Sequence, residues 1–100
     1  MATVLSAAQE RRREPRTAAR AFGWDADALL RPGRPVRVLE LSSGGALIES
    51  ATAVRPESTT ELQLSSDDGR AGVRAHVAGC WVQALDPLRY RARLVFHARL

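Results

Sequence analysis

Hydrophobic and polar residues alternate in short runs along most of the 100-residue chain. In residues 60–65 the pattern puts Leu62 and Leu64 on one side. In residues 88–97 a longer run puts more residues on one side, namely Tyr90, Ala92, Leu94 and Phe96. A period of two is typical of β-strands that bury one face. The pattern therefore predicts a chain built mainly of half-buried strands.

Clusters of turn residues predict where these strands end. Asp67-Asp68-Gly69 has the composition of a hairpin turn. Arg31-Pro32-Gly33-Arg34 predicts a type II turn, and Leu85-Asp86-Pro87 predicts a further turn. Ser42-Ser43-Gly44-Gly45 separates an apolar run over 36–41 from a second run over 46–49, and its glycines permit positive φ. Residues 51–59 are expected to form a surface loop.

Two segments are less regular. In residues 22–31, Trp24, Ala26 and Ala28 alternate with aspartates, which favours a first strand, although the stretch also suits a helix. Between residues 73 and 82 the alternation slips near Ala78 and Gly79. A slip of this kind predicts a β-bulge.

Six short strands at hairpin spacing, with no helix between them, predict an all-β fold: a small six-stranded antiparallel β-barrel. Residues 3–13 lack glycine and proline, so a short helix is expected there, ending before Pro15. The predicted organisation is a flexible, partly helical N-terminal arm over residues 1–16, followed by the barrel over 17–100.

Length and composition predict the number of domains, the cysteine chemistry and the cellular location. One hundred residues correspond to one domain. Cys80 is the single cysteine, so no internal disulfide and no cysteine-based metal site is expected. The N-terminus lacks a signal-peptide pattern, and no apolar run is long enough to cross a membrane. These features predict a cytoplasmic protein without membrane insertion.

The charge balance indicates an anionic partner. The net charge is +4, and all 15 basic residues are arginine. The densest positive segment is Arg-Arg-Arg-Glu-Pro-Arg at residues 11–16, which could also be only a solvated basic arm.

No catalytic motif is present, so an enzyme is not expected. His76 and His97 stand alone in strand patterns, and Asp67-Asp68 is a turn pair rather than a metal site. Trp24 and Trp81 are expected to be core or barrel-end aromatics.

Two motifs in these segments belong together. Arg12 and Arg16 form R-x-x-x-R, with Arg13 beside them. Further along, residues 40–45, Glu-Leu-Ser-Ser-Gly-Gly, fit [DN]-x-S-x-x-G except at the first position. This pair of motifs, in this order in a β-rich chain, resembles the PilZ domain, a bacterial receptor for cyclic di-GMP. The resemblance covers roughly residues 10–97.

The resemblance implies a six-stranded antiparallel barrel with a flexible arm, which binds cyclic di-GMP without a cofactor and signals to an effector protein, here unidentified. By position, the arm would clamp guanine and phosphate with Arg12 and Arg16, helped by Arg13. The arginine fork matches the O6 and N7 acceptors of guanine. On the barrel side the implied residues are Glu40 and Ser42 as ligand contacts and Gly45 as the residue that permits the turn.

Glu40 departs from the family pattern, which has aspartate or asparagine there. The carboxylate can still accept from guanine N1–H and N2–H₂, but it sits one methylene further out. We therefore expect weakened rather than abolished binding. Arg91 and Arg93, two apart on the last strand, could add phosphate contacts, or they could protect an edge strand against aggregation.

Two alternatives remain beside the receptor. The chain could be a degenerate PilZ-like domain that binds protein and no nucleotide. A small basic barrel could also bind single-stranded nucleic acid, but that function needs aromatics along an exposed strand face. The chain has five aromatic residues, and Tyr90 and Phe96 fall on the expected inner face, so nucleic acid is not the expected partner. The sequence does not indicate which process is regulated.

Overall fold

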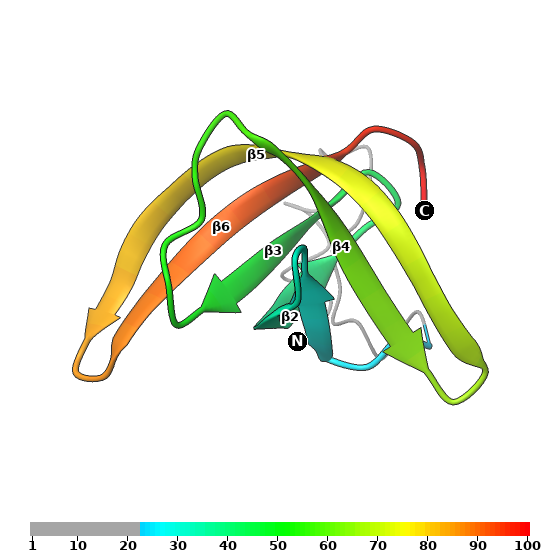
Figure 1. The fold of residues 1–100 in the computed structure, drawn as a ribbon, viewed down its shortest axis with the longest axis horizontal. Coiled ribbons are helices and arrows are strands. Elements are labelled where there is room, and N and C mark those ends of the chain that lie inside the picture. Colours follow the sequence, from blue (N-terminus) through cyan, green and yellow to red (C-terminus); the bar gives the residue numbers. More distant parts are fainter. Residues whose placement is uncertain (1–22) are drawn as a thin grey trace, which may run out of the picture.

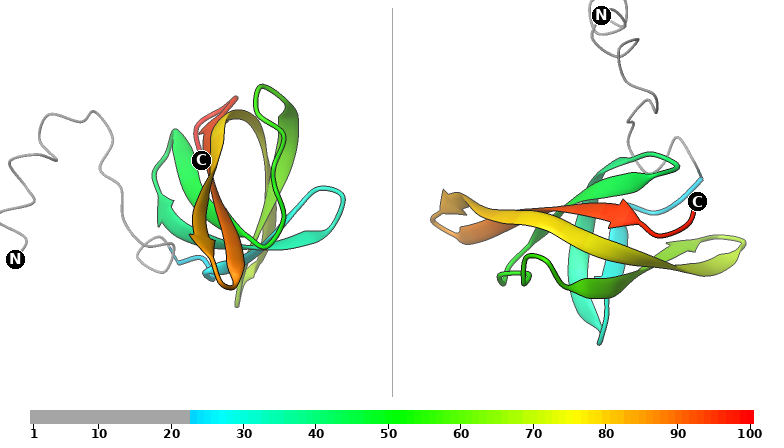
Figure 2. Two further views of the ribbon diagram at one scale, coloured as in Figure 1. Left: turned by 90° about the vertical axis from the view of Figure 1, so that its left-hand side faces the viewer. Right: turned by 90° about the horizontal axis from the view of Figure 1, so that it is seen from above.

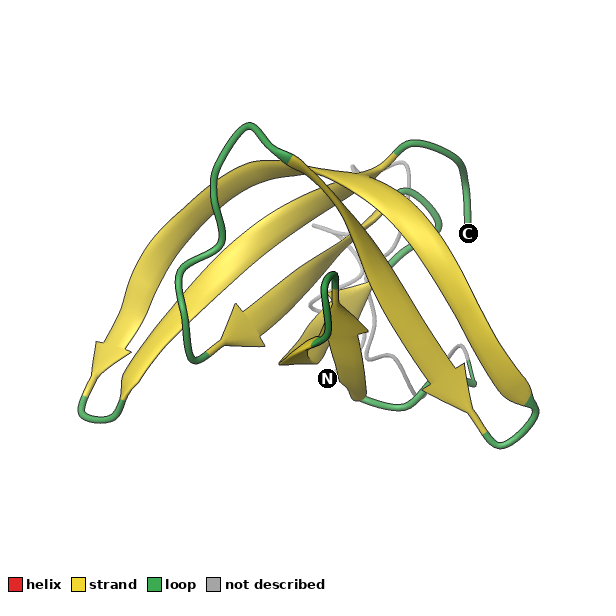
Figure 3. Cartoon of the chain, viewed as in Figure 1, coloured by secondary structure: helices red, strands yellow, loops and turns green. Residues whose placement is uncertain are grey.

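The computed structural model describes residues 23–100, which form strands and loops and no helix (Figure 3). The strands are β1 (Asp27–Leu30), β2 (Arg34–Leu41), β3 (Gly45–Ser50), β4 (Thr59–Ser66), β5 (Gly69–Leu85) and β6 (Leu88–Phe96). The expected N-terminal arm, with its helix over residues 3–13, lies outside the described residues. So do the arginines of its motif, Arg12, Arg13 and Arg16.

The strands close into one antiparallel barrel in the order β1-β2-β3-β6-β5-β4 (Figure 1). Hairpins join β1 to β2, β2 to β3, β4 to β5, and β5 to β6. Two pairings join strands that are distant in sequence, β1 with β4 and β3 with β6. The predicted fold class, an all-β six-stranded antiparallel barrel, is confirmed for the described part of the chain.

The inner face of the barrel holds the core. Leu62 and Leu64 are fully buried on β4, as the alternating pattern predicts. On β6 the inward residues Ala92, Leu94 and Phe96 are also buried. Trp24 is partly buried and packs against this core, which confirms its expected place. The largest fully buried side chains come from five strands: Leu41, Ile48, Leu62, Leu64, Val77 and Leu94.

The first strand is shorter than the segment 22–31 predicted for it, because pairing with β2 and β4 begins late. Residues 24–26 lie outside the strand, with a bend at Ala26, but they already alternate in burial, and the Asp25 N–H donates to Ser65 O at 2.7 Å. The helical alternative for this segment is excluded. The expected type II turn over 31–34 is wrong, since the turn's hydrogen bond runs from Gly33 N–H to Leu30 O at 2.9 Å, one residue earlier.

Two sequence-based details of β5 are confirmed. Asp67-Asp68-Gly69 forms the β4–β5 hairpin, where Gly69 has a φ of 145°. The register with β6 shifts between Val77 and Gly79, where a bulge was predicted. A second shift lies between Val82 and Ala84.

The β5–β6 hairpin extends past the rest of the barrel. The pairing of β4 with β5 ends at His76, whereas β5 and β6 remain paired to Leu85 and Leu88. Figure 2 shows this end of the ribbon projecting beyond the other strands. Residues 23–100 contain no helical stretch of the length and hydrophobicity that crossing a bilayer requires.

Candidate functional site

The outer faces of β2, β3 and β6 lie side by side and carry the predicted barrel-side residues. Leu47 of β3 pairs with Glu40 of β2 and with Arg93 of β6. In the next outward row, Glu49 of β3 pairs with Arg37 and with Arg91. We call this surface the β2–β3–β6 face and define it by its outward residues, Arg37, Glu40, Gly45, Leu47, Glu49, Arg89, Arg91 and Arg93.

Glu40 reaches this face because of an irregularity in β2. Val36 and Val38 point into the core, so strict alternation would send Glu40 inward as well. The register with β3 shifts between Val38 and Glu40, leaving Leu39 as the extra residue. The bulge turns Glu40 outward and brings Leu41 into the core, where it is fully buried.

The turn after β2 is held together by Ser42. Its hydroxyl oxygen accepts hydrogen bonds from the backbone N–H groups of Gly44 at 3.3 Å and Gly45 at 3.2 Å. The Ser42 N–H donates to Gly45 O at 2.9 Å. Ser42 is 4% exposed, so in this conformation its hydroxyl serves the turn. Its predicted contact with a ligand stays a prediction.

Gly45 is required by a close approach rather than by its backbone angles. Among the described residues, the glycines with positive φ are Gly23, Gly33 and Gly69, so positive φ does not explain Gly44 or Gly45. A Cβ built at Gly45 would collide with the backbone carbonyl oxygen of Leu94 on β6. The glycine therefore allows β3 and β6 to lie close together at the start of their pairing.

Arg91 is held on the face but incompletely bonded. Its Nε lies 4.0 Å from the Glu49 carboxylate, which is an ion pair but too long for a hydrogen bond. The Nε atom is buried and has no hydrogen-bond partner among the described residues. Buried donors are usually satisfied, so this N–H is an exception among the described residues.

Arg91 and Arg93 do not lie on an edge strand. In the closed barrel β6 is flanked by β3 and β5 along the stretch that holds both arginines. The alternative that they guard an exposed edge is therefore wrong. Their side chains point outward, as the alternation of β6 predicts, and are half-buried.

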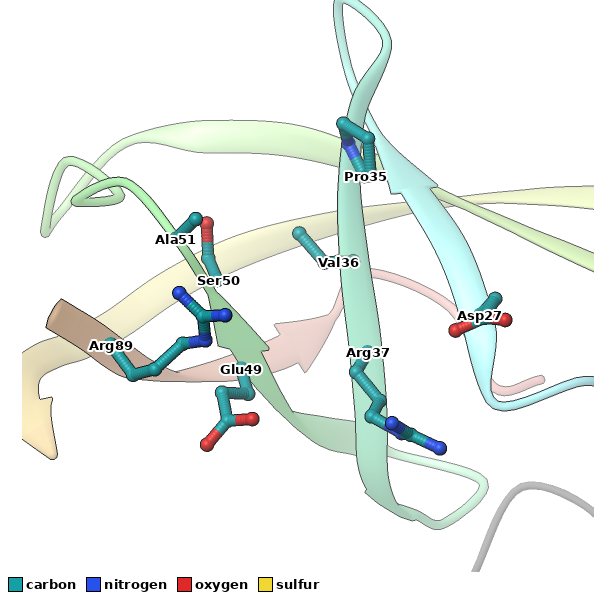
Figure 4. A pocket seen from close by; sticks show the side chains of 8 residues that line it. All are labelled: Asp27, Pro35, Val36, Arg37, Glu49, Ser50, Ala51 and Arg89. Atoms are coloured by element: carbon teal, nitrogen blue, oxygen red, sulfur yellow. The ribbon is translucent and has the colours of Figure 1, made fainter. Parts of the chain in front are cut away.

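A depression of about 260 Å³ lies where this face approaches the projecting hairpin. Arg37 and Arg89 line it together with Glu49 and Ser50. In Figure 4 the guanidinium of Arg89 extends toward Ser50 and Ala51, whereas Arg37 points away from β3. Two arginines of the β2–β3–β6 face therefore line one depression.

Of the two places expected for Trp81, the core is excluded, and the residue lies on the hairpin that projects from one end of the barrel. It is 40% exposed on the outer side of β5, and its register partner on β6 is Arg91. Its ring leans along the strand toward Gly79, where an added Cβ would lie 4.0 Å from Trp81 Cζ3. An exposed ring beside arginines can stack on a planar base.

The structure thus brings Glu40, Gly45, Arg91 and Arg93 to one face, places Ser42 at its end, and leaves the three arm arginines outside the described residues. The sequence analysis missed Arg37 and Arg89. Arg37 lies in an alternating strand, so the sequence could have predicted that its side chain points outward. That it lies near β6 could not be predicted, because this depends on the pairing of β3 with β6.

The described residues hold no group of three or more histidine, cysteine, aspartate or glutamate side chains arranged to bind a metal ion. In comparisons with known proteins, no family model, no curated protein and no solved structure matches this chain.

Proposed function

We propose that the protein is a PilZ-like receptor that binds cyclic di-GMP on the β2–β3–β6 face and signals to an effector protein. One observation carries this proposal. Glu40 of β2 and Arg93 of β6 flank Leu47 of β3 on the same face, and Arg91 lies in the next row. Residues 40 and 93 are far apart in sequence, so their juxtaposition is a property of the barrel.

The chemistry of this face suits a cyclic dinucleotide. Arg91 and Arg93 supply cationic donors for phosphate oxygens or for guanine O6 and N7. The Arg91 side chain is one-third exposed, so its guanidinium can contact a ligand beside its ion pair with Glu49. Glu40 supplies a carboxylate for the N1–H and N2–H₂ groups of guanine. Leu47 lies between Glu40 and Arg93 and is 8% exposed, so the polar groups of its neighbours cover it on this face.

In this proposal the arm closes the site. Arg12 and Arg16, with Arg13 beside them, would bind the ligand from above and become ordered. Ordering the arm costs conformational entropy but changes the surface that a partner meets. A domain without catalytic chemistry can transmit a signal in this way.

Isothermal titration calorimetry of the full chain with cyclic di-GMP tests the proposal, with GMP as the ligand control. We expect specific binding of the cyclic dinucleotide. The Arg12→Ala/Arg16→Ala variant should bind roughly 30- to 10⁴-fold more weakly, because two bidentate arginine contacts are lost. No heat with a protein shown to be folded would contradict the proposal.

A matched pair of variants locates the site on the barrel. Arg93→Ala should weaken binding roughly tenfold to a hundredfold, because it removes a charged donor from the face. Arg70→Ala should leave affinity unchanged, since Arg70 lies opposite Ser65 in the β4–β5 hairpin, away from the β2–β3–β6 face. Equal losses in both variants would indicate only a dependence on net charge.

One observation favours the second candidate, a degenerate PilZ-like domain that binds protein and no nucleotide. The Ser42 hydroxyl is already occupied by the Gly44 and Gly45 N–H groups. Glu40→Asp separates the two candidates, since it restores the residue of the family motif. If the variant binds cyclic di-GMP and the natural chain does not, the natural chain has kept the fold but lost the ability to bind this ligand.

A further inference from the structure

The projecting β5–β6 hairpin carries apolar side chains that the barrel does not cover. Leu85 is 80% exposed and Val82 is 49% exposed, and Trp81 and Leu88 are each about two-fifths exposed. Most of the exposed large hydrophobic residues among the described part of the chain lie between positions 81 and 88. They therefore lie together at the projecting end of the β5–β6 ribbon, whose backbone is seen in Figures 1 and 2.

The same segment has an open strand edge. β4 accompanies β5 only as far as His76, and the Val77 backbone exchanges hydrogen bonds with Glu57 and Ser58 of the preceding loop. From Gly79 to Leu85, no strand among the described residues pairs with the side of β5 that faces away from β6. The backbone groups along this edge can pair with a further strand.

The edge lacks the residues that keep natural edges free. Residues 77–85 read Val-Ala-Gly-Cys-Trp-Val-Gln-Ala-Leu and contain no charged residue and no proline. Solvent-exposed edges are normally protected by charges, proline, very short length or β-bulges. This edge has register shifts between Val77 and Gly79 and between Val82 and Ala84, but it has neither charges nor proline. An uncharged, apolar edge of this length is a surface for strand addition.

We propose that this edge pairs with the same edge of a second copy of the chain, antiparallel about a two-fold axis near Val82. The two hairpins would then form one continuous four-stranded ribbon. The inference does not depend on nucleotide binding, because it rests on the edge of β5 that faces away from β6.

Charge and side-chain size favour a second copy as the occupant. The protein carries a net charge of +4, so two copies repel each other overall, and an edge without charged residues adds no local repulsion. An antiparallel pairing centred on Val82 sets Gly79 opposite Leu85 and Cys80 opposite Ala84, with no charge facing another charge. A two-fold contact of this kind satisfies both edges at once, as closed symmetry requires.

The contact is short, so the dimer should be weak. Interfaces below the standard size are typical of transient associations. We expect sedimentation of the full chain to show a monomer–dimer equilibrium with a dissociation constant in the micromolar range. Amide hydrogen exchange at low and high protein concentration should show protection that increases with concentration across residues 79–85.

Val82 and Val95 offer a matched pair of variants, since they are 49% and 46% exposed and lie toward opposite ends of the β5–β6 ribbon. Val82→Lys should abolish the dimer by placing like charges beside the axis. Val95→Lys should leave it intact. Mixing Val82→Lys with Val82→Glu should restore association, which also shows that both variants are folded.

The proposal is overturned by a monomer at every concentration, by equal effects of the two lysine variants, or by failure of the mixed variants to associate. Protection of residues 79–85 that is independent of concentration would also overturn it. That result would mean that a segment of the same chain, and not a second copy, covers the edge.

Discussion

Gly45 stands where the turn after β2 meets β6, and the lack of a side chain there sets how close the strands can come. We predict that Gly45→Ala lowers the free energy of unfolding by roughly 1–3 kcal/mol, because the new methyl group must displace the Leu94 carbonyl. Urea denaturation followed by circular dichroism measures this change.

Gly79→Ala is the control for that prediction. A Cβ at Gly79 would meet only the rim of the Trp81 ring, in ordinary van der Waals contact. Its free energy of unfolding should therefore change by about 1 kcal/mol or less, and a gain is allowed because glycine is unfavourable within a strand. Equal destabilisation by both substitutions would argue against a special close approach at Gly45.

The Ser42 hydroxyl gives a second prediction at the scale of a residue. Ser42→Ala removes the acceptor of two backbone N–H groups in a part-buried turn. The cost should be roughly 1–3 kcal/mol in unfolding free energy, measured without ligand. Ser43→Ala, one residue along, should change stability by no more than about 0.5 kcal/mol. An unchanged stability of Ser42→Ala would indicate that the hydroxyl is not needed for the turn.

Side-chain direction could be predicted from the sequence wherever a strand alternates without interruption. Arg91 and Arg93 are such a case, since both face outward as β6 requires. Glu40 is the opposite case, because the extra residue Leu39 changes the phase of β2 only once its pairing with β3 is known. The bulge makes Leu41, and not Leu39, the inward residue.

At the scale of the element, a leucine on the inner face of a strand should contribute more to the free energy of unfolding than a leucine on an outer face. Leu64 is fully buried, whereas Leu29 of β1 is 40% exposed. Leu64→Ala should cost about 2–5 kcal/mol in unfolding free energy, from lost burial and the cavity left behind. Leu29→Ala should cost about 1 kcal/mol or less. Similar values for both would contradict the observed inward direction of Leu64.

Most elements could be predicted because each combines an alternating run with a strong turn signal. The β4–β5 hairpin follows from Asp67-Asp68-Gly69, and the bulge in β5 follows from the slip at Ala78. The start of β1 could not be predicted in this way. Residues 24–26 alternate like a strand, but strand pairing starts only at Asp27, where β2 lies alongside.

At the scale of the whole molecule, the positive charge should govern the strength of nucleotide binding. The chain carries +4 and cyclic di-GMP carries two phosphates. We predict that affinity falls about fivefold or more between about 0.05 M and about 0.5 M salt, because salt screens exposed charges. Calorimetric titrations at several salt concentrations measure this. An affinity independent of salt would indicate that phosphate contacts contribute little.

Strand order was the part of the fold that periodicity could not provide. Six alternating segments with hairpin turns are compatible with several arrangements of neighbours. The pairing of β3 with β6 joins residues that are distant in sequence, and it depends on long-range packing. This pairing also builds the candidate site, since it sets Glu49 beside Arg91 and Leu47 beside Arg93.

The last residues of the chain are tied to the turn that the candidate site uses. Leu100 N–H donates to Ser43 O at 2.8 Å, and Phe96 N–H donates to Gly44 O at 2.8 Å. A rearrangement of that turn must stretch or break these two bonds. Movement of the turn is therefore coupled to movement of the C-terminal residues. A fluorescent dye at Leu100 would report a rearrangement of the turn.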